Sequence, residues 1–283
     1  MHCSRAGVKV KRFWNWIPKH RENVREPQLL EEYQSLLEDA VKLQLRSDVP
    51  LGLFLSSGVD SGALLAIMRD YSSGPVQTFT IGFEGGEKTN EITDAAVTAK
   101  QYGADHYSMM VSHQDYFKYF ERYMTDMEEP VGHEAAPAFY FVSKITSEHV
   151  KVALTGQGAD EPWAGYGRYV GVKFSSLYSR LPGVVTRGVG PMLAKLPGRM
   201  ERLKRGLNSL GEPDMLTRFT KVYSFFSADM KMSLFKGGLA VRSEAAAYQT
   251  KEALRHLQED VKHLTLSRRC STLIRVPICR MTC

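Results

Sequence analysis

The sequence lacks an apolar run of the roughly 18 residues that a membrane-spanning helix requires. Its most apolar stretch, residues 181–197, is interrupted by prolines, glycines and an arginine. The N-terminus is basic but has no apolar centre of the kind found in signal peptides. We therefore expect a cytoplasmic protein that has no membrane partner.

Cysteine is scarce in this sequence. The four cysteines never occur in CxxC spacing, which argues against a zinc site and against a redox pair. Three of them crowd into the last fourteen residues, at Cys270, Cys279 and Cys283.

The formal net charge is +6, but the basic residues are scattered along the chain. Such a scatter is typical of a solvated surface, so we expect no nucleic-acid partner.

Strand-like and helical patterns alternate over the first 155 or so of the 283 residues. Alternation of this kind predicts an α/β fold, a parallel sheet with helices on both faces. The expected strands are 51–55, 76–83, 106–111 and 150–154, and the expected helices are 29–45, 61–68, 91–102, 113–127 and 136–149.

Strand patterns stop at about residue 169, where Pro-Gly pairs begin to separate short helical stretches. This change predicts a C-terminal, mostly helical region. The expected division is a linker remnant at 1–28, an α/β domain at 29–168, a helical region at 169–266 and an aberrant tail at 267–283.

The first chemical motif is SSGVDS at residues 56–61, which follows a strand and opens a helix. Its small residues let backbone N–H groups approach an oxyanion, and the helix N-terminus favours negative charge. The hydroxyls of Ser56 and Ser61 can serve the same anion. Asp60 would repel a phosphate alone, but it suits a Mg²⁺ ion that bridges carboxylate and phosphate. The alternative is a plain strand–turn–helix connection.

The second motif is TGQGADE at residues 155–161, again directly after a strand. Gly156 and Gly158 permit a tight turn, and Asp160 and Glu161 supply carboxylates at the same sheet edge. The two motifs together can hold one nucleotide–metal complex. Two unrelated loops are the alternative.

The two motifs and the sequences that flank them resemble those of a known family. SSGVDS is similar to the pyrophosphate loop SGGxDS of the N-type ATP pyrophosphatases, whose fold is called adenine nucleotide alpha hydrolase-like. The flanking sequences resemble those of the asparagine synthetase class, in which SG(E/D/Q)GxDE precedes an FGGY-like stretch. They cover roughly residues 12–265 and include LRSDVPLG at 45–52, TFTIGF at 78–83, Glu129-Pro130 and TGQGADEPWAGYGRY at 155–169.

The resemblance implies a role for each matching position. ATP would be bound by Leu55, Ser56, Ser57, Gly58, Val59, Asp60, Ser61, Ile81, Thr155 and Gly156. Asp60 and Asp160 would be ligands of Mg²⁺, and the implied catalytic set is Asp60, Gln157, Asp160 and Glu161. Glu91 and Glu129 also fall at acidic family positions, with a helix N-terminal acid and a surface residue as the respective alternatives.

The implied reaction has two steps and uses ATP and Mg²⁺ as cofactors. The β-carboxylate of aspartate attacks the α-phosphorus of ATP, which gives β-aspartyl-AMP and pyrophosphate. Ammonia then displaces AMP to give asparagine. The protein would contribute positioning and neutralisation of phosphate charge.

Two positions depart from the family pattern. Ser57 stands where the family has its first loop glycine, and Gln157 stands where several members carry a glutamate thought to handle the ammonia proton. An amide cannot act as a base. Another group or water would take that proton, or this branch uses a different acceptor.

Family members normally begin with a glutaminase domain whose nucleophile is an N-terminal cysteine. Here position 2 is His2, and Cys3 cannot present a free α-amino group. FWNWIP at 13–18 resembles the linker into the synthetase domain. We therefore expect a fragment without its glutaminase domain, and the use of free ammonia is the alternative.

The C-terminal tail suggests a change of reading frame. Codons can be chosen for residues 269–283 so that the same string, read from its third base, encodes MLYIDTRTNLPDDL. That peptide resembles the segment that follows in the family. If the hypothesis is correct, the three crowded cysteines have no function and the chain lacks its last helical region.

Three functions therefore stay open at this point. The leading one is an ATP-dependent ligase domain of the asparagine synthetase type. The second is a related amidotransferase that acts on another carboxylate, such as a cell-surface sugar acid or a β-lactam precursor. The third is an inactive nucleotide-binding fragment.

Overall fold

A computed structural model describes residues 1–11, 21, 23–85, 91–128, 135–163, 165–166 and separate positions between 214 and 255. The chain divides into two compact units. One unit is Arg21–Ala159, and the other combines Met1–His20 with Asp160–Cys283. The domain boundaries expected from the sequence stay a prediction.

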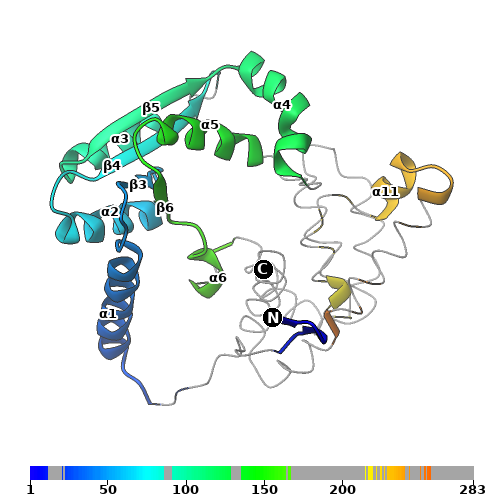
Figure 1. Ribbon diagram of the computed structural model, residues 1–283, viewed down its shortest axis with the longest axis horizontal. Coiled ribbons are helices and arrows are strands. Elements are labelled where there is room, and N and C mark those ends of the chain that lie inside the picture. Colours follow the sequence, from blue (N-terminus) through cyan, green and yellow to red (C-terminus); the bar gives the residue numbers. More distant parts are fainter. Residues whose placement is uncertain are drawn as a thin grey trace, which may run out of the picture. The chain divides into compact units, whose positions relative to one another are not determined.

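The unit Arg21–Ala159 is built on a four-stranded sheet whose paired strands are all parallel. This arrangement confirms the predicted α/β class. In chain order (Figure 1) its elements are α1 (Glu26–Gln44), β3 (Leu51–Phe54), α2 (Val59–Tyr71), β4 (Gln77–Phe83), α3 (Ile92–Gln101), β5 (Asp105–Val111), α4 (His113–Met127), α5 (Ala136–Ser147) and β6 (Val152–Thr155).

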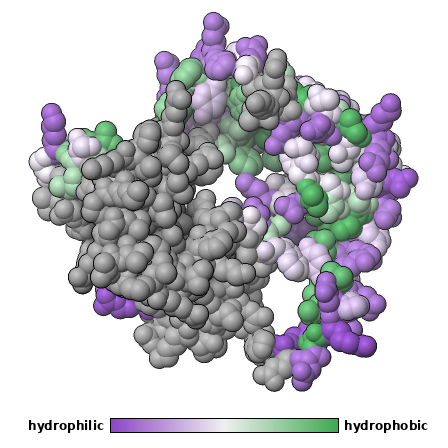
Figure 2. All heavy atoms as spheres, turned by 180° about the vertical axis from the view of Figure 1, so that it is seen from behind, coloured by the Kyte–Doolittle hydropathy of each residue, from purple (hydrophilic) through white to green (hydrophobic). Residues whose placement is uncertain are grey.

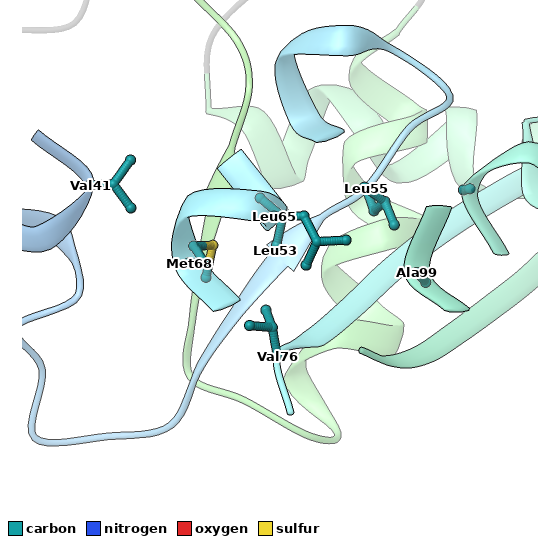
Figure 3. Packing of buried hydrophobic residues seen from close by; sticks show 8 residues of the cluster. Val41, Leu53, Leu55, Leu65, Met68, Val76 and Ala99 are labelled. Carbon is teal, nitrogen blue, oxygen red and sulfur yellow. The ribbon is translucent and has the colours of Figure 1, made fainter. Parts of the chain in front are cut away.

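Helices α1, α2 and α3 pack on one face of this sheet. Leu53 and Leu55 point to this face because alternate residues of a strand share a side, and both are at most 2% exposed. They meet Leu65 and Met68 of α2 and Ala99 of α3 in one cluster (Figure 3). Burial of each of these leucines contributes roughly 2 kcal/mol to folding.

Helices α4 and α5 cover the opposite face. Phe79 is fully buried there with Val142 of α5, and its ring stacks on Tyr107 of β5 at 5.5 Å between centroids. The beginning of α4 is fixed by Ser112, whose hydroxyl accepts a hydrogen bond from the N–H of Asp115 at 3.1 Å. A serine cap of this type satisfies one of the free amides of the first helical turn. The predicted coverage of both faces is thus confirmed.

The strands lie side by side in the order β5-β4-β3-β6. The chain moves from β3 through β4 to β5 in one direction, and it then returns to place β6 on the other side of β3. The space beyond the carboxyl ends of β3 and β6 is therefore the switch point of the sheet, where ligands bind in folds of this type. Both predicted motifs directly follow these two strands.

Gly52 permits the close packing of β3 beneath the ring of Phe79. A Cβ at position 52 would lie 2.6 Å from Phe79 Cε2 and 3.1 Å from the carbonyl oxygen of Gln77. Both distances are too short for a side chain to fit without displacing a neighbour. The glycine in the middle of this strand therefore has a packing reason.

The other unit is described only in part. Strands β1 (His2–Ser4) and β2 (Gly7–Lys9) form a short antiparallel hairpin, and the described residues of this unit also include helices α6 (Asp160–Trp163) and α11 (Ala228–Leu234). Most of the helical region expected at 169–266 lies outside the described residues. All of the tail at 267–283 lies outside them as well.

The described surface is mixed in character. On the face shown in Figure 2, hydrophilic and hydrophobic residues are interspersed over the described part. Within the described ranges, no helix combines the length and apolar content needed to cross a bilayer.

His106 of β5 gives the fold a pH-dependent weakness. Its Nδ1 lies 3.0 Å from the hydroxyl of Thr78, while its Nε2 is buried with no hydrogen-bond partner among the described residues. Burial lowers the pKa of this imidazole below its usual 6.5 because the charged form loses its hydration. The folded protein therefore holds His106 in its neutral form.

We predict that the free energy of unfolding falls as the pH drops below about 6.5, the pKa of histidine in the unfolded chain. Below that pH the unfolded chain binds a proton that folded His106 resists, and the loss ends once the pH is below the folded pKa. Urea unfolding of the wild type and of His106→Gln between pH 5 and 8 measures this effect. An equal pH slope in the two proteins would rule the histidine out as its source.

Candidate active site

The loop after β3 is held in shape by one buried hydroxyl. Ser61, which is 4% exposed, accepts a hydrogen bond from the N–H of Ser56 at 3.1 Å, and its oxygen lies 2.9 Å from Ser56 Oγ. The carbonyl oxygens of Ser56 and Gly58 lie 3.3 and 3.1 Å from the same oxygen. A hydroxyl has one proton and two lone pairs, so the two carbonyls share the proton of Ser61, and the N–H and hydroxyl of Ser56 can donate to its two lone pairs.

The Ser61 hydroxyl is therefore a clamp that folds residues 56–58 back onto the first turn of α2. The oxygen of Ser56 also accepts a hydrogen bond from the N–H of Gly58 at 3.1 Å, which tightens the same turn. The predicted contact between these two serines and a phosphate stays a prediction.

The first turn of α2 faces outward and is open to a ligand. No side chain among the described residues caps this helix, whose N-cap is Gly58. Ser57, Gly58, Val59 and Asp60 are all exposed. The first amides of a helix have no intrahelical acceptor, and they carry the positive end of the helix dipole. This end of α2 can therefore receive an anion.

The loop after β6 reaches the same place from the neighbouring strand. Thr155 pairs with Phe54 of β3, so the two loops begin side by side. A Cβ on Gly156 would lie 2.9 Å from the amide nitrogen of Ser61 and 3.2 Å from Cβ of Asp60. The backbone at Gly156 thus lies directly against the first turn of α2, and only glycine allows this approach.

The remaining residues of the β6 loop complete a tight turn. Gly158 has a φ of +98°, a conformation that other residues rarely adopt. The hydroxyl of Thr155 accepts a hydrogen bond from the N–H of Gln157 at 3.4 Å. The side chain of Gln157 is exposed.

Leu55 directly follows β3, and Ile81 lies on the adjacent strand β4. Leu55 is buried in the core between the sheet and α2, and its N–H donates to the carbonyl of Phe79 at 2.9 Å. Ile81 is half-buried on the opposite face, against the aromatic cluster of α4 and α5. Their side chains therefore pack in the core, and the predicted contact of these two residues with ATP stays a prediction.

Asp160 and Glu161 belong to α6 in the other unit, where they make local contacts. The hydroxyl of Tyr166 donates to Glu161 Oε1 at 2.8 Å, and the N–H of Gly165 donates to the carbonyl of Asp160 at 2.9 Å. The side chain of Asp160 is exposed. The pairing of Asp60 with Asp160 as ligands of one metal ion stays a prediction.

The family resemblance also implies acidic roles for Glu91 and Glu129. Glu91 is the exposed residue that directly precedes α3, which fits the helix N-terminal role named as its alternative. Glu129 lies outside the described residues.

The acidic side chains do not gather into a protein-only metal site. In the part of the chain that the structure describes, no three His, Cys, Asp or Glu side chains lie close enough to hold an ion. Mg²⁺ is commonly held by one or two carboxylates, phosphate oxygens of the substrate and water. The exposed carboxylate of Asp60 at an anion-receptive helix end fits that kind of site.

One residue near the site was missed in the sequence. Thr80 of β4 is 4% exposed, and its hydroxyl donates to the carbonyl of Leu55, the residue before the loop. A threonine in a buried strand gave no signal of this contact, because threonine is common in strands for its shape alone.

Comparison with known proteins adds to this geometry. The family model described as asparagine synthase matches residues 32–273. The chain is 30% identical over 213 residues to asparagine synthetase [glutamine-hydrolyzing] 1 of Bacillus subtilis (strain 168), which covers 75% of this chain and 33% of that protein. A protein provisionally named asparagine synthetase [glutamine-hydrolyzing] 2 in Methanocaldococcus jannaschii is 31% identical over 204 residues, or 71% of this chain and 38% of its own.

A more distant relative carries a different name. The amidase chyE of Penicillium rubens is 26% identical over 155 residues, which is 50% of this chain and 23% of that protein. The chain spans between a third and two fifths of the length of the two asparagine synthetase relatives. Since the family model covers most of the chain, including both strand-end loops, the chain belongs to the asparagine synthase family.

Proposed function

We propose that this chain is the ATP-dependent synthetase part of an amidotransferase, which activates the β-carboxylate of aspartate as β-aspartyl-AMP and transfers it to ammonia. The observation that carries the proposal is the backbone contact between Gly156 and the first turn of α2 at the switch point of the sheet. Family membership supports a ligase of the amidotransferase class. The cytoplasmic setting expected from the sequence belongs to this proposal.

The local groups suit a nucleotide triphosphate. The open amides of the first turn of α2 would donate to phosphate oxygens, and the Ser61 clamp would keep them in place. A bound Mg²⁺, held by Asp60, would neutralise negative charge on the phosphates. The exposed end of β6 would lie along the nucleotide at Thr155 and Gly156. Fixed donors of this kind lower a barrier because they need no rearrangement during the reaction.

Attack by ammonia on the acyl-adenylate would proceed without an acid–base residue at position 157. Gln157 is exposed and carries an amide, which can orient ammonia or an acyl group by hydrogen bonds but cannot take up a proton. The proton released when ammonia attacks would pass to water or to another carboxylate. Positioning would then dominate this half-reaction.

A second candidate is a ligase of the same type that acts on a different carboxylate. Two observations favour it, the amide at position 157 and a relative whose name is not that of an asparagine synthetase. A third candidate is a fragment that binds ATP·Mg²⁺ without chemistry. The three candidates differ in which carboxylic acid, if any, supports the exchange of pyrophosphate into ATP.

The contact at Gly156 gives a test of the nucleotide site. In Gly156→Ala the new Cβ would lie 2.9 Å from Ser61 N and 3.1 Å from the carbonyl carbon of Asp60, so the two loops must move apart. We expect the Kd for ATP·Mg²⁺ to rise at least about tenfold, the equivalent of ~1.4 kcal/mol. Titration with a fluorescent ATP analogue measures it.

Gly62→Ala is the matched control for this variant. Its Cβ would meet only Thr98 Cγ2 at 3.9 Å, which is ordinary contact, and alanine favours the helical conformation there. The control should bind ATP·Mg²⁺ like the wild type. Unchanged affinity in Gly156→Ala would show that the nucleotide does not use this pair of loops.

Asp60 gives a test of the metal. In Asp60→Asn the side chain keeps its shape but loses its charge, so the gain in ATP affinity on addition of Mg²⁺ should shrink severalfold. Asp70→Asn, an exposed aspartate in the last turn of the same helix, is the control and should keep the full gain. The measurement is ATP-analogue binding with Mg²⁺ and with EDTA. The same gain in both variants would exclude Asp60 as a ligand.

The reaction itself is tested by exchange of labelled pyrophosphate into ATP. We expect the purified chain to catalyse exchange that depends on aspartate and on Mg²⁺, because adenylylation is reversible while pyrophosphate is present. Exchange with another acid and none with aspartate would favour the second candidate. Binding of ATP·Mg²⁺ with no exchange for any acid would favour the third.

A further inference from the structure

Strand β3 leaves the sheet at Leu55, and its last peptide is held by side chains. The ladder between β3 and β4 ends at the pair Phe54–Phe79. Leu55 still donates its N–H to the carbonyl of Phe79 at 2.9 Å. Its carbonyl instead accepts the hydroxyl of Thr80.

The peptide that joins Leu55 to Ser56 is thereby fixed at both ends. Its C=O group accepts from the hydroxyl of Thr80, and its N–H group donates to the hydroxyl of Ser61 at 3.1 Å. Because a peptide is planar, two such bonds determine its rotation about the chain axis. One bond comes from the sheet and the other from helix α2.

Both hydroxyls are shielded from water. Thr80 and Ser61 are each 4% exposed, and Leu55 is 2% exposed. A buried carbonyl that loses its donor carries the full cost of desolvation. A chain without the Thr80 hydroxyl would therefore turn the Leu55 carbonyl to find another donor, and that turn would carry Ser56 and the loop with it.

We propose that Thr80 is a positioning residue for the phosphate-binding loop. Its hydroxyl fixes the peptide from which the loop departs, and so it sets the direction of the amides at the start of α2. The residue acts through Leu55 and touches no substrate. The consequence for ATP rests on the proposed function, whereas the consequence for loop order does not.

The same strand offers a matched control. Thr78 is two residues earlier on β4, so it shares the face of Thr80, and it is fully buried. Its hydroxyl donates to the carbonyl of Asp105 at 3.3 Å and lies 3.0 Å from Nδ1 of His106, both on β5, the strand on the other side. Thr78→Val therefore removes a buried hydroxyl without touching the peptide at Leu55.

The experiment compares Thr80→Val, Thr80→Ser and Thr78→Val in the full chain. Valine keeps the shape of threonine and lacks the hydroxyl, and serine keeps the hydroxyl. We expect Thr80→Val to raise the Kd for ATP·Mg²⁺ about tenfold, the effect of one misplaced buried hydrogen bond. Thr80→Ser should stay within about twofold of the wild type. Thr78→Val should lower the urea midpoint but leave the affinity unchanged.

Amide hydrogen exchange without nucleotide supplies the independent measurement. Residues 56–58 should exchange several times faster in Thr80→Val than in Thr78→Val. Equal exchange of this loop in Thr80→Val and Thr78→Val would overturn the positioning role. The same holds if the two variants lose ATP affinity in proportion to their loss of stability. Faster loop exchange in a chain that binds no ATP·Mg²⁺ would support the role of Thr80 and sink the proposed function.

Discussion

The backbone contact between Gly156 and the first turn of α2 is the constraint on which the site depends. Two segments about a hundred residues apart approach to a distance at which no Cβ fits between them. Such a close approach requires both backbones to be held in place, because a mobile segment would move away to relieve the contact. The rest of the local structure supplies that fixation: the Ser61 hydroxyl on one side and the tight turn at Gly158 on the other.

The order of the strands explains why these two loops meet. The first three strands spread in one direction with α2 and α3 on one face, and α4 and α5 bring the chain back along the other face. Strand β6 then pairs with the edge of β3 that β4 does not occupy. The register is set where Phe54 pairs with Thr155, so the two loops begin at the same height. Gly52, which leaves room for the ring of Phe79 beside β3, helps that central strand to stay close to its neighbours.

Much of this arrangement was accessible from the sequence. Short apolar runs followed by small residues predicted strands β3 and β6 and the loops at their ends, and the structure confirms the parallel sheet. Helix boundaries were less accurate, since α2 begins at Val59 and not at Ser61. The difference matters, because it turns Ser61 from a residue at the helix start into a buried clamp inside the first turn.

Other features left no pattern that sequence reasoning can use. The contact between Thr80 and Leu55 depends on the position at which β3 departs from the ladder, which a propensity for strand does not encode. The hairpin of β1 and β2 is three residues on each strand and exposed throughout, so it has no alternation of apolar residues to reveal it. The strand-end motif placed Asp160 and Glu161 at the sheet edge, but the pairing of Asp160 with Asp60 as metal ligands rests on the family resemblance and stays a prediction.

Asp60 presents an electrostatic problem whose solution follows from its position. Its carboxylate lies in the first turn of α2, where the helix dipole stabilises one negative charge by roughly 0.3–1 kcal/mol. A phosphate at the same turn would be repelled by the carboxylate. A divalent cation between the carboxylate and the phosphate replaces their repulsion by attraction of both groups to the cation. The helix end then binds the phosphate–metal complex better than it binds phosphate alone. An acid in this position is thus unfavourable for a site that binds phosphate without metal and favourable for one that binds a phosphate–metal complex.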